Sequence, residues 1–97
     1  MRIENFILSV VRKLETIYPG TIAFAHREWN EPRTYEWWCV CISDLNIYMN
    51  DKRFKVLCSA WRKAGRARGV NVVFCACTPH EKNLNKFAEE ENLIMNV

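Results

Sequence analysis

A helical pattern between two strand patterns constrains the fold of this chain more than any other feature. The helical pattern runs from about Asp51 to Ala67, and the flanking strand patterns cover residues 35–43 and 70–77. Its apolar face consists of Phe54, Leu57, Cys58 and Trp61. A helix that joins two strands of one sheet makes a crossover, which leaves those strands parallel. The later strand should therefore run parallel to the earlier one, either beside it or with another strand between them.

An amphipathic helix and a hairpin are predicted before this crossover. Apolar side chains recur at helical spacing over residues 3–17, and Tyr18-Pro19-Gly20 should end that helix. Residues 21–27 are typical of a short strand. We expect this strand to form a hairpin with the longer aromatic strand at residues 35–43, and residues 44–50 to form a connection.

A third helix has the clearest start signal in the chain. Thr78 is a suitable N-cap, Pro79 suits the first helical position, and Glu81 completes a capping box. This helix should end near Glu91. The apolar tail at residues 93–97 is compatible with a last short strand.

The predicted elements therefore follow the order α-β-β-α-β-α. The chain has 97 residues, of which 49% are hydrophobic and 26% charged, so a single globular domain over residues 1–97 is expected. The predicted fold class is α+β. We expect a two-layer sandwich in which helices pack on a small mixed or antiparallel sheet.

Four of the five cysteines form two Cys-x-Cys pairs on predicted strands: Cys39 with Cys41, and Cys75 with Cys77. Because side chains alternate along a strand, the members of a pair face the same way, with Cα atoms roughly 6.5–7 Å apart. That spacing disfavours zinc, which usually uses Cys-x2-4-Cys turns, and it would strain a disulfide within a pair. A cross-strand metal site stays open if the two pairs are neighbours on one face. We expect the cysteines, Cys58 included, to be small buried side chains that let helices lie close to the sheet, with no metal and no cofactor.

Catalytic and targeting signals are missing from the sequence. His26 and His80 are the only histidines, and there is no Gly-rich phosphate loop, paired-histidine metal motif or nucleophile elbow. The N-terminal apolar run is interrupted by Glu4 and lacks a cleavage site, and no stretch is long enough to span a membrane. We therefore expect a cytoplasmic protein with reduced thiols, no membrane partner and no enzymatic activity.

Positive charge is concentrated in one segment. Residues 52–68 hold seven basic residues and no acidic one, whereas the rest of the chain holds seven basic and eleven acidic residues. The candidate partner-binding residues are Lys52, Lys55, Arg62, Lys63, Arg66 and Arg68, together with Trp29 of the hairpin loop. Such a helix face either contacts phosphates, with hairpin aromatics for stacking, or binds an acidic protein surface, or is the solvated side of an ordinary helix.

Several short motifs recur in an order that resembles a known group of proteins. They are Leu14…Tyr18-Pro19, Ile22-x-Phe24, Tyr35-x-Trp37, Asp51-x-x-Phe54, Gly69-x-Asn71-Val72-x-Phe74 and a closing segment around Leu84. In this order the chain resembles small uncharacterised proteins carried by phages and integrative elements of Gram-positive gut bacteria, although its crossover helix is less acidic than theirs. The resemblance implies a mobile-element accessory protein that binds a host factor, as anti-CRISPR and other anti-defence inhibitors do.

Two hypotheses for function follow. The first is a small non-enzymatic interaction protein that binds and modulates or inhibits a host protein or nucleoprotein through the basic helix face. The alternative is a nucleic-acid-binding module that uses the same face and the hairpin aromatics. Salt dependence separates them, because contacts to phosphates make affinity fall steeply as salt rises.

Overall fold

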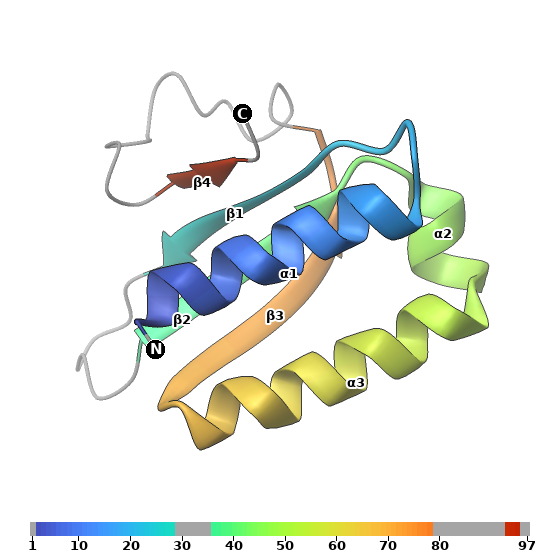
Figure 1. Cartoon of the computed structure of the whole chain (residues 1–97). Helices are drawn as coiled ribbons and strands as arrows, with labels where there is room; N and C mark the ends of the chain where they lie inside the picture. Colours follow the sequence, from blue (N-terminus) through green and yellow to red (C-terminus); the bar gives the residue numbers. More distant parts are fainter. Residues whose placement is uncertain (1, 29–35, 79–92, 96–97) are drawn as a thin grey trace.

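The computed structural model describes residues 2–28, 36–78 and 93–95, in the order α-β-β-α-α-β-β (Figure 1). The helices are α1 (Ile3–Ile17), α2 (Leu45–Asn50) and α3 (Lys52–Ala67). The strands are β1 (Ala23–Glu28), β2 (Glu36–Ile42), β3 (Val70–Ala76) and β4 (Leu93–Met95). The predicted α+β class is confirmed. None of the described helices is long and apolar enough to cross a membrane.

The predicted order of elements is wrong. The sequence predicts a connection over residues 44–50, but Leu45–Asn50 forms α2. The Asp44 carboxylate caps this helix by accepting a hydrogen bond from the Ile47 backbone N–H at 3.0 Å. A helix of six residues is too short to show a helical period in the sequence. The strand β4 also follows β3, and the predicted third helix lies, beyond Thr78, outside the described residues.

The described strands form one mixed sheet in the order β3-β2-β1-β4. β1 and β2 pair as the predicted antiparallel hairpin, and β4 pairs antiparallel with the other edge of β1. β2 and β3 are parallel and directly adjacent, as the crossover through α3 requires. The predicted parallel pair is therefore confirmed, and of the two arrangements that were open the side-by-side one is observed.

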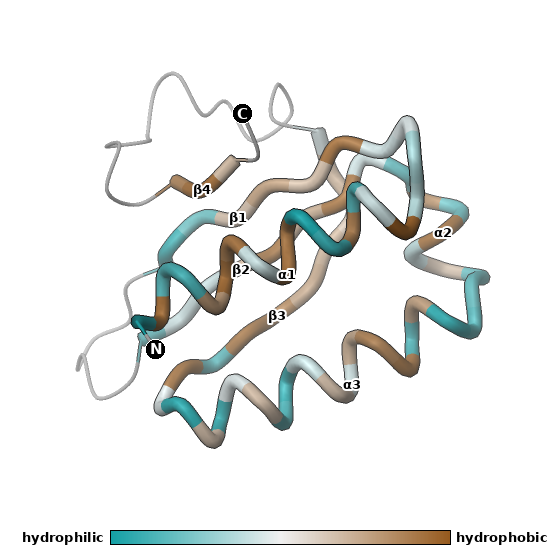
Figure 2. The backbone as a smooth tube through the Cα atoms, in the orientation of Figure 1, coloured by the Kyte–Doolittle hydropathy of each residue, from teal (hydrophilic) through white to brown (hydrophobic). Residues whose placement is uncertain are grey.

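The two long helices, α1 and α3, pack on the same face of this sheet, which we call the helix face (Figure 1). The sheet contributes Ala23 and Ala25 from β1, Trp38, Val40 and Ile42 from β2, and Val70, Val72 and Phe74 from β3. Both helices alternate between hydrophobic and hydrophilic positions along their length, as amphipathic helices do (Figure 2). The main core of the described structure therefore lies between α1, α3 and one side of the sheet.

Aromatic side chains anchor α3 to this core. Phe54 and Trp61 are buried, and both contact the ring of Phe74 on β3, with centroid distances of 6.2 and 6.1 Å. At the start of the helix, the Asp51 carboxylate accepts hydrogen bonds from the Phe54 backbone N–H at 2.8 Å and from the Tyr18 hydroxyl at 3.0 Å. The cap therefore fixes α3 both to its own first turn and to the end of α1.

A glycine lets the far end of α3 lie close to β3. A Cβ atom at Gly65 would lie 3.0 Å from Cγ2 of Val72 and 3.2 Å from the backbone oxygen of Val70. The neighbour at 3.2 Å is main chain, which cannot move aside as a flexible side chain can. Gly69, at φ +81°, then turns the chain from the helix into β3. These two glycines help to set the position of α3 on the sheet, and therefore the direction in which its exposed side faces.

Candidate functional site

The exposed side of α3 carries the predicted cations. We call Lys52, Lys55, Arg62, Lys63 and Arg66 the basic face, and all five side chains are exposed. Arg53 and the C-cap residue Arg68 are also exposed, whereas Trp29 lies outside the described residues. With a rise of about 1.5 Å per residue, the basic face extends about 21 Å along the helix from its first to its last residue.

Carboxylates do not neutralise this face within the described parts of the chain. The ion pairs found there join His26 and Arg27 to glutamates of α1, β1 and β2, and none involves α3. Because no acidic residue lies between Lys52 and Arg68, the cations crowded along the helix repel each other and create a positive potential in the solvent around them. The basic face is therefore an electrostatically unsatisfied surface.

A hollow of about 400 Å³ borders the basic face between α2, α3 and β3. Its lining combines the cations Lys55 and Arg62 with apolar and aromatic side chains: Tyr48, Met49, Phe54, Cys58 and Phe74. The Arg62 guanidinium lies 5.6 Å from the centre of the Phe74 ring, and Met49 is 57% exposed. An apolar floor flanked by two cations suits a ligand group that is itself apolar and next to a negative charge.

Arg68 differs from the other predicted cations because it also has a structural role. Its Nη1 donates a hydrogen bond to the Ala64 backbone oxygen at 2.9 Å, which satisfies a carbonyl in the last turn of α3. Its guanidinium also lies 4.8 Å from the centre of the Phe6 ring of α1. We therefore treat Arg68 as the less available end of the predicted binding surface.

Arg27 on β1 contrasts with the basic face, because its charge is paired with carboxylates of the fold. Its Nη2 lies 2.7 Å from Oε1 of Glu4 and its Nε 2.8 Å from Oε1 of Glu36. The guanidinium also lies 4.9 Å from the centre of the Trp38 ring, and only 12% of the side chain is exposed. Because its charge is paired on two sides, Arg27 is not a binding residue in the sense of the basic face.

The two Cys-x-Cys pairs meet on the sheet face opposite α1 and α3, which we call the thiol face. The Sγ atoms of Cys39 and Cys41 lie 3.7 Å apart, and those of Cys75 and Cys77 lie 3.8 Å apart. Across the strands, Sγ of Cys75 lies 3.1 Å from that of Cys39 and 2.8 Å from that of Cys41. The Cα spacing therefore does not keep the sulfurs apart, because the side chains lean toward one another above the sheet.

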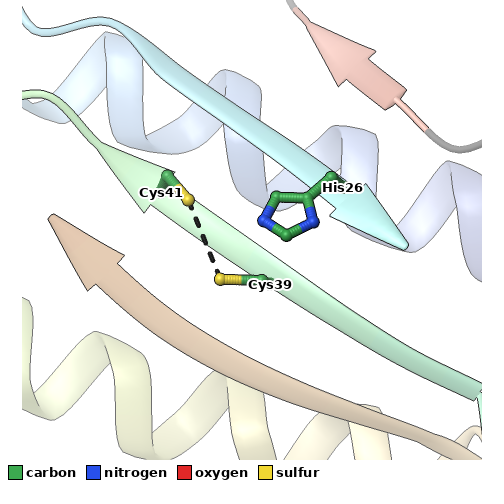
Figure 3. Close-up of side chains that lie close together, drawn as sticks. All are labelled: His26, Cys39 and Cys41. Carbon is green, nitrogen blue, oxygen red and sulfur yellow. Dashed lines mark hydrogen bonds between the residues drawn. The ribbon is translucent and has the colours of Figure 1, made fainter. Parts of the chain in front are cut away.

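His26 joins this cluster from β1, where it stands opposite Cys39 in the antiparallel register. Its imidazole lies beside Cys39 and Cys41 (Figure 3), and the ligand atoms of these three residues all lie within 4.8 Å of one another. The same limit holds for the sulfurs of Cys41, Cys75 and Cys77. His26 was not among the predicted site residues, although the hairpin alternation places it on the same face as the thiols.

Contact between the sulfurs and burial favour the protonated form of the thiols at Cys41 and Cys75. Hydrogen bonds with Cys39 and Cys75, followed by burial, raise the pKa of the Cys41 thiol. A hydrogen bond with Cys39 is the largest cause that raises the pKa of Cys75. On the helix face, burial raises the pKa of Cys58 to about 12. An activated, nucleophilic thiolate therefore has no support at these three positions.

Among the helices that the structure describes, α3 alone has the predicted arrangement in which a small thiol lies in its contact with the sheet. Cys58 lies on the apolar side of α3 within the core of the helix face. Cys39 and Cys41 belong instead to a second cluster with Phe24, against which Cys75 and Cys77 pack. The thiols of this second cluster do not lie between the sheet and α1 or α3, so they do not bring these helices close to the sheet.

Comparison with known proteins does not help to interpret either surface. Comparison with protein-family models, with curated proteins and with solved structures finds no match for this chain. The basic face and the thiol face must therefore be interpreted from their own geometry.

Proposed function

We propose that this chain is a small non-enzymatic binding protein that uses the basic face of α3 to bind and modulate or inhibit a host protein or nucleoprotein. One observation carries this proposal. The segment from Lys52 to Arg68 has no acidic residue, and its cations are exposed along a helix whose other side is already committed to the core. A partner can therefore contact the basic face without disturbing the fold.

The hollow beside the basic face favours a protein surface as the partner. Protein interfaces are rich in aromatic residues, Met and Arg, with polar residues at the rim. Met49, Phe74 and Arg62 provide this composition at one place. An acidic segment with one apolar anchor would fit, its side chain in the hollow and its carboxylates on Lys55 and Arg62. The resemblance to mobile-element accessory proteins agrees with a target of this kind.

Nucleic acid is the second candidate, because unmixed positive charge is also what phosphate backbones attract. Cations spaced over about 21 Å on one helix could contact several phosphates of a duplex. The two candidates differ in what they predict for salt. Neutralising several phosphates makes the affinity fall steeply with salt concentration, whereas a protein interface with an apolar centre loses less.

The test is a charge reversal on the basic face with a matched control. The variant Arg62→Glu/Lys63→Glu/Arg66→Glu should fold normally, because exposed substitutions usually change stability by less than about 0.5 kcal/mol each. The control Arg2→Glu/Arg12→Glu/Lys13→Glu makes the same change in net charge at exposed positions in and just before α1. We expect the wild type and the control, but not the first variant, to retain a partner from host lysate.

Nuclease treatment and salt then identify the class of partner. A protein that is retained after nuclease treatment supports the first candidate, whereas loss of all binding with nuclease supports the second. Direct titration with a short DNA or RNA duplex at two salt concentrations gives the slope that phosphate contacts produce. Equal binding by both triple variants would show that the basic face is only solvated surface.

A further inference from the structure

The thiol face brings sulfur atoms together from two neighbouring strands. Cys41 stands opposite Cys75 in the parallel register of β2 and β3, and alternation places Cys39 and Cys77 on the same face. The sulfurs of Cys39, Cys41 and Cys75 form a triangle whose sides are 3.7, 3.1 and 2.8 Å. Apolar packing alone does not require three sulfurs to converge on one point.

The triangle has nearly the dimensions of one face of a metal tetrahedron. Zinc–sulfur bonds of about 2.3 Å place two sulfurs of a tetrahedral site about 3.8 Å apart. The side between Cys39 and Cys41, at 3.7 Å, already has this length. The distances from Sγ of Cys75 to those of Cys39 and Cys41 would each have to increase by about 1 Å or less, which small side-chain rotations allow.

Two side chains flank the triangle and could complete the tetrahedron. Sγ of Cys77 lies 3.8 Å from that of Cys75, and the imidazole of His26 lies within 4.8 Å of the sulfurs of Cys39 and Cys41. The ligand set is then either four cysteines or three cysteines and one histidine. Both sets are common in structural zinc sites.

The geometry points to a site for one thiophilic cation of the zinc class, held by Cys39, Cys41 and Cys75 with Cys77 or His26 as the fourth ligand. Each cysteine that binds the metal releases its thiol proton to solvent, so that one metal–sulfur bond replaces one S–H bond. Four protein ligands leave no open position, so the role is structural: the ion ties β2 to β3. This inference is independent of the proposed function, which uses the exposed side of α3.

Metal uptake by the reduced full-length protein is the first test. We expect elemental analysis after incubation with zinc and desalting to find about one zinc ion per chain. Cobalt should produce the sulfur-to-metal charge-transfer absorption and the strong visible bands of a tetrahedral thiolate site. Compared with the zinc-free folded protein, zinc should slow the alkylation of Cys39, Cys41 and Cys75, mapped by mass spectrometry, more than it slows the alkylation of the buried Cys58. Failure to bind metal, or closure of a Cys41–Cys75 disulfide instead, would overturn the proposal.

Single substitutions locate the ligands. Cys41→Ser and Cys75→Ser should each weaken zinc affinity by more than about 100-fold, which exceeds the effect of losing an outer-shell contact. Cys58→Ala, on the helix face, is the control and should leave affinity unchanged. Either Cys77→Ser or His26→Gln should also weaken binding, and the assigned ligand set is wrong if neither does. The alkylation pattern of the wild type decides the matter even if a variant fails to fold.

Discussion

The two faces of the same sheet are built from different chemistry. On the helix face, β2 contributes Trp38, Val40 and Ile42, which are large or branched and lie under α1 and α3. On the thiol face, the same strand contributes Cys39 and Cys41. Both sets are buried, so burial does not explain the difference. The helix face fills volume, whereas the thiol face brings potential ligand atoms together, and this contrast underlies the metal proposal.

The largest expected effect tests the helix face. Trp61→Ala removes a buried aromatic anchor of α3 and should lower the free energy of unfolding by about 3–5 kcal/mol, measured by chemical denaturation. Val56→Ala, at a position that is 69% exposed on the same helix, is the matched control and should change stability little. A Trp61→Ala variant that unfolds like the wild type would contradict the packing of α3 described above.

Adjacent residues of β2 allow the two faces to be compared directly, because Val40 and Cys41 are both fully buried. Without metal, Val40→Ala should cost about 2 kcal/mol, since two methyl groups are lost, and Cys41→Ala about 1 kcal/mol. Zinc at 100 times its dissociation constant should stabilise the wild type and Val40→Ala by about 2.7 kcal/mol, but not Cys41→Ala. Zinc should therefore reverse the ranking of the two variants. An unchanged ranking would mean that both faces serve packing alone.

The smallest expected effect concerns the cap that begins α3. The hydrogen bond from the Phe54 backbone N–H is the main cause that lowers the pKa of Asp51 below 3.8. A lowered pKa in the folded state stabilises the protein above pH 3.8, and this contribution is lost as the pH falls through the folded-state pKa. Asp51→Asn keeps a capping oxygen but does not titrate. The difference in melting temperature between wild type and Asp51→Asn should therefore shrink on acidification, and a constant difference would contradict the assigned cause.

Periodic segments of the fold could be predicted from the sequence, but short ones could not. The helix at Ile3–Ile17 was found with its bounds, because fifteen residues show a full amphipathic pattern and Tyr18-Pro19-Gly20 ends it. The helix α2 was missed because six residues are too few to show a helical period, and none of them is fully buried, although Ile47 and Tyr48 pack partly against the core. A local cap alone is a weak signal in a sequence.

Part of the candidate site could likewise be predicted from the sequence, and part could not. The basic face follows from helical spacing alone, so its residues could be named in advance. Strand alternation also predicts that Cys39 and Cys41 lie on the same face of the sheet. That the two cysteine pairs meet depends on the register of β2 against β3, which the packing of α3 and Gly65 helps to fix. No local pattern encodes that register, and the sulfurs therefore could not be placed within contact distance from the sequence.

The parallel pairing of β2 and β3 also has a consequence for how the chain folds. Cys41 and Cys75 are 34 residues apart in sequence, and the loop between them contains α2 and α3. Closing a loop of this length before its contacts form slows folding and costs chain entropy. In the chain-entropy model, a cross-link between these two residues lowers the entropy of the unfolded chain and so raises the free energy of unfolding by about 3–4 kcal/mol. A metal ion that links β2 to β3 on one side of the sheet would thus also hold in place the helix that presents the cations on the other side.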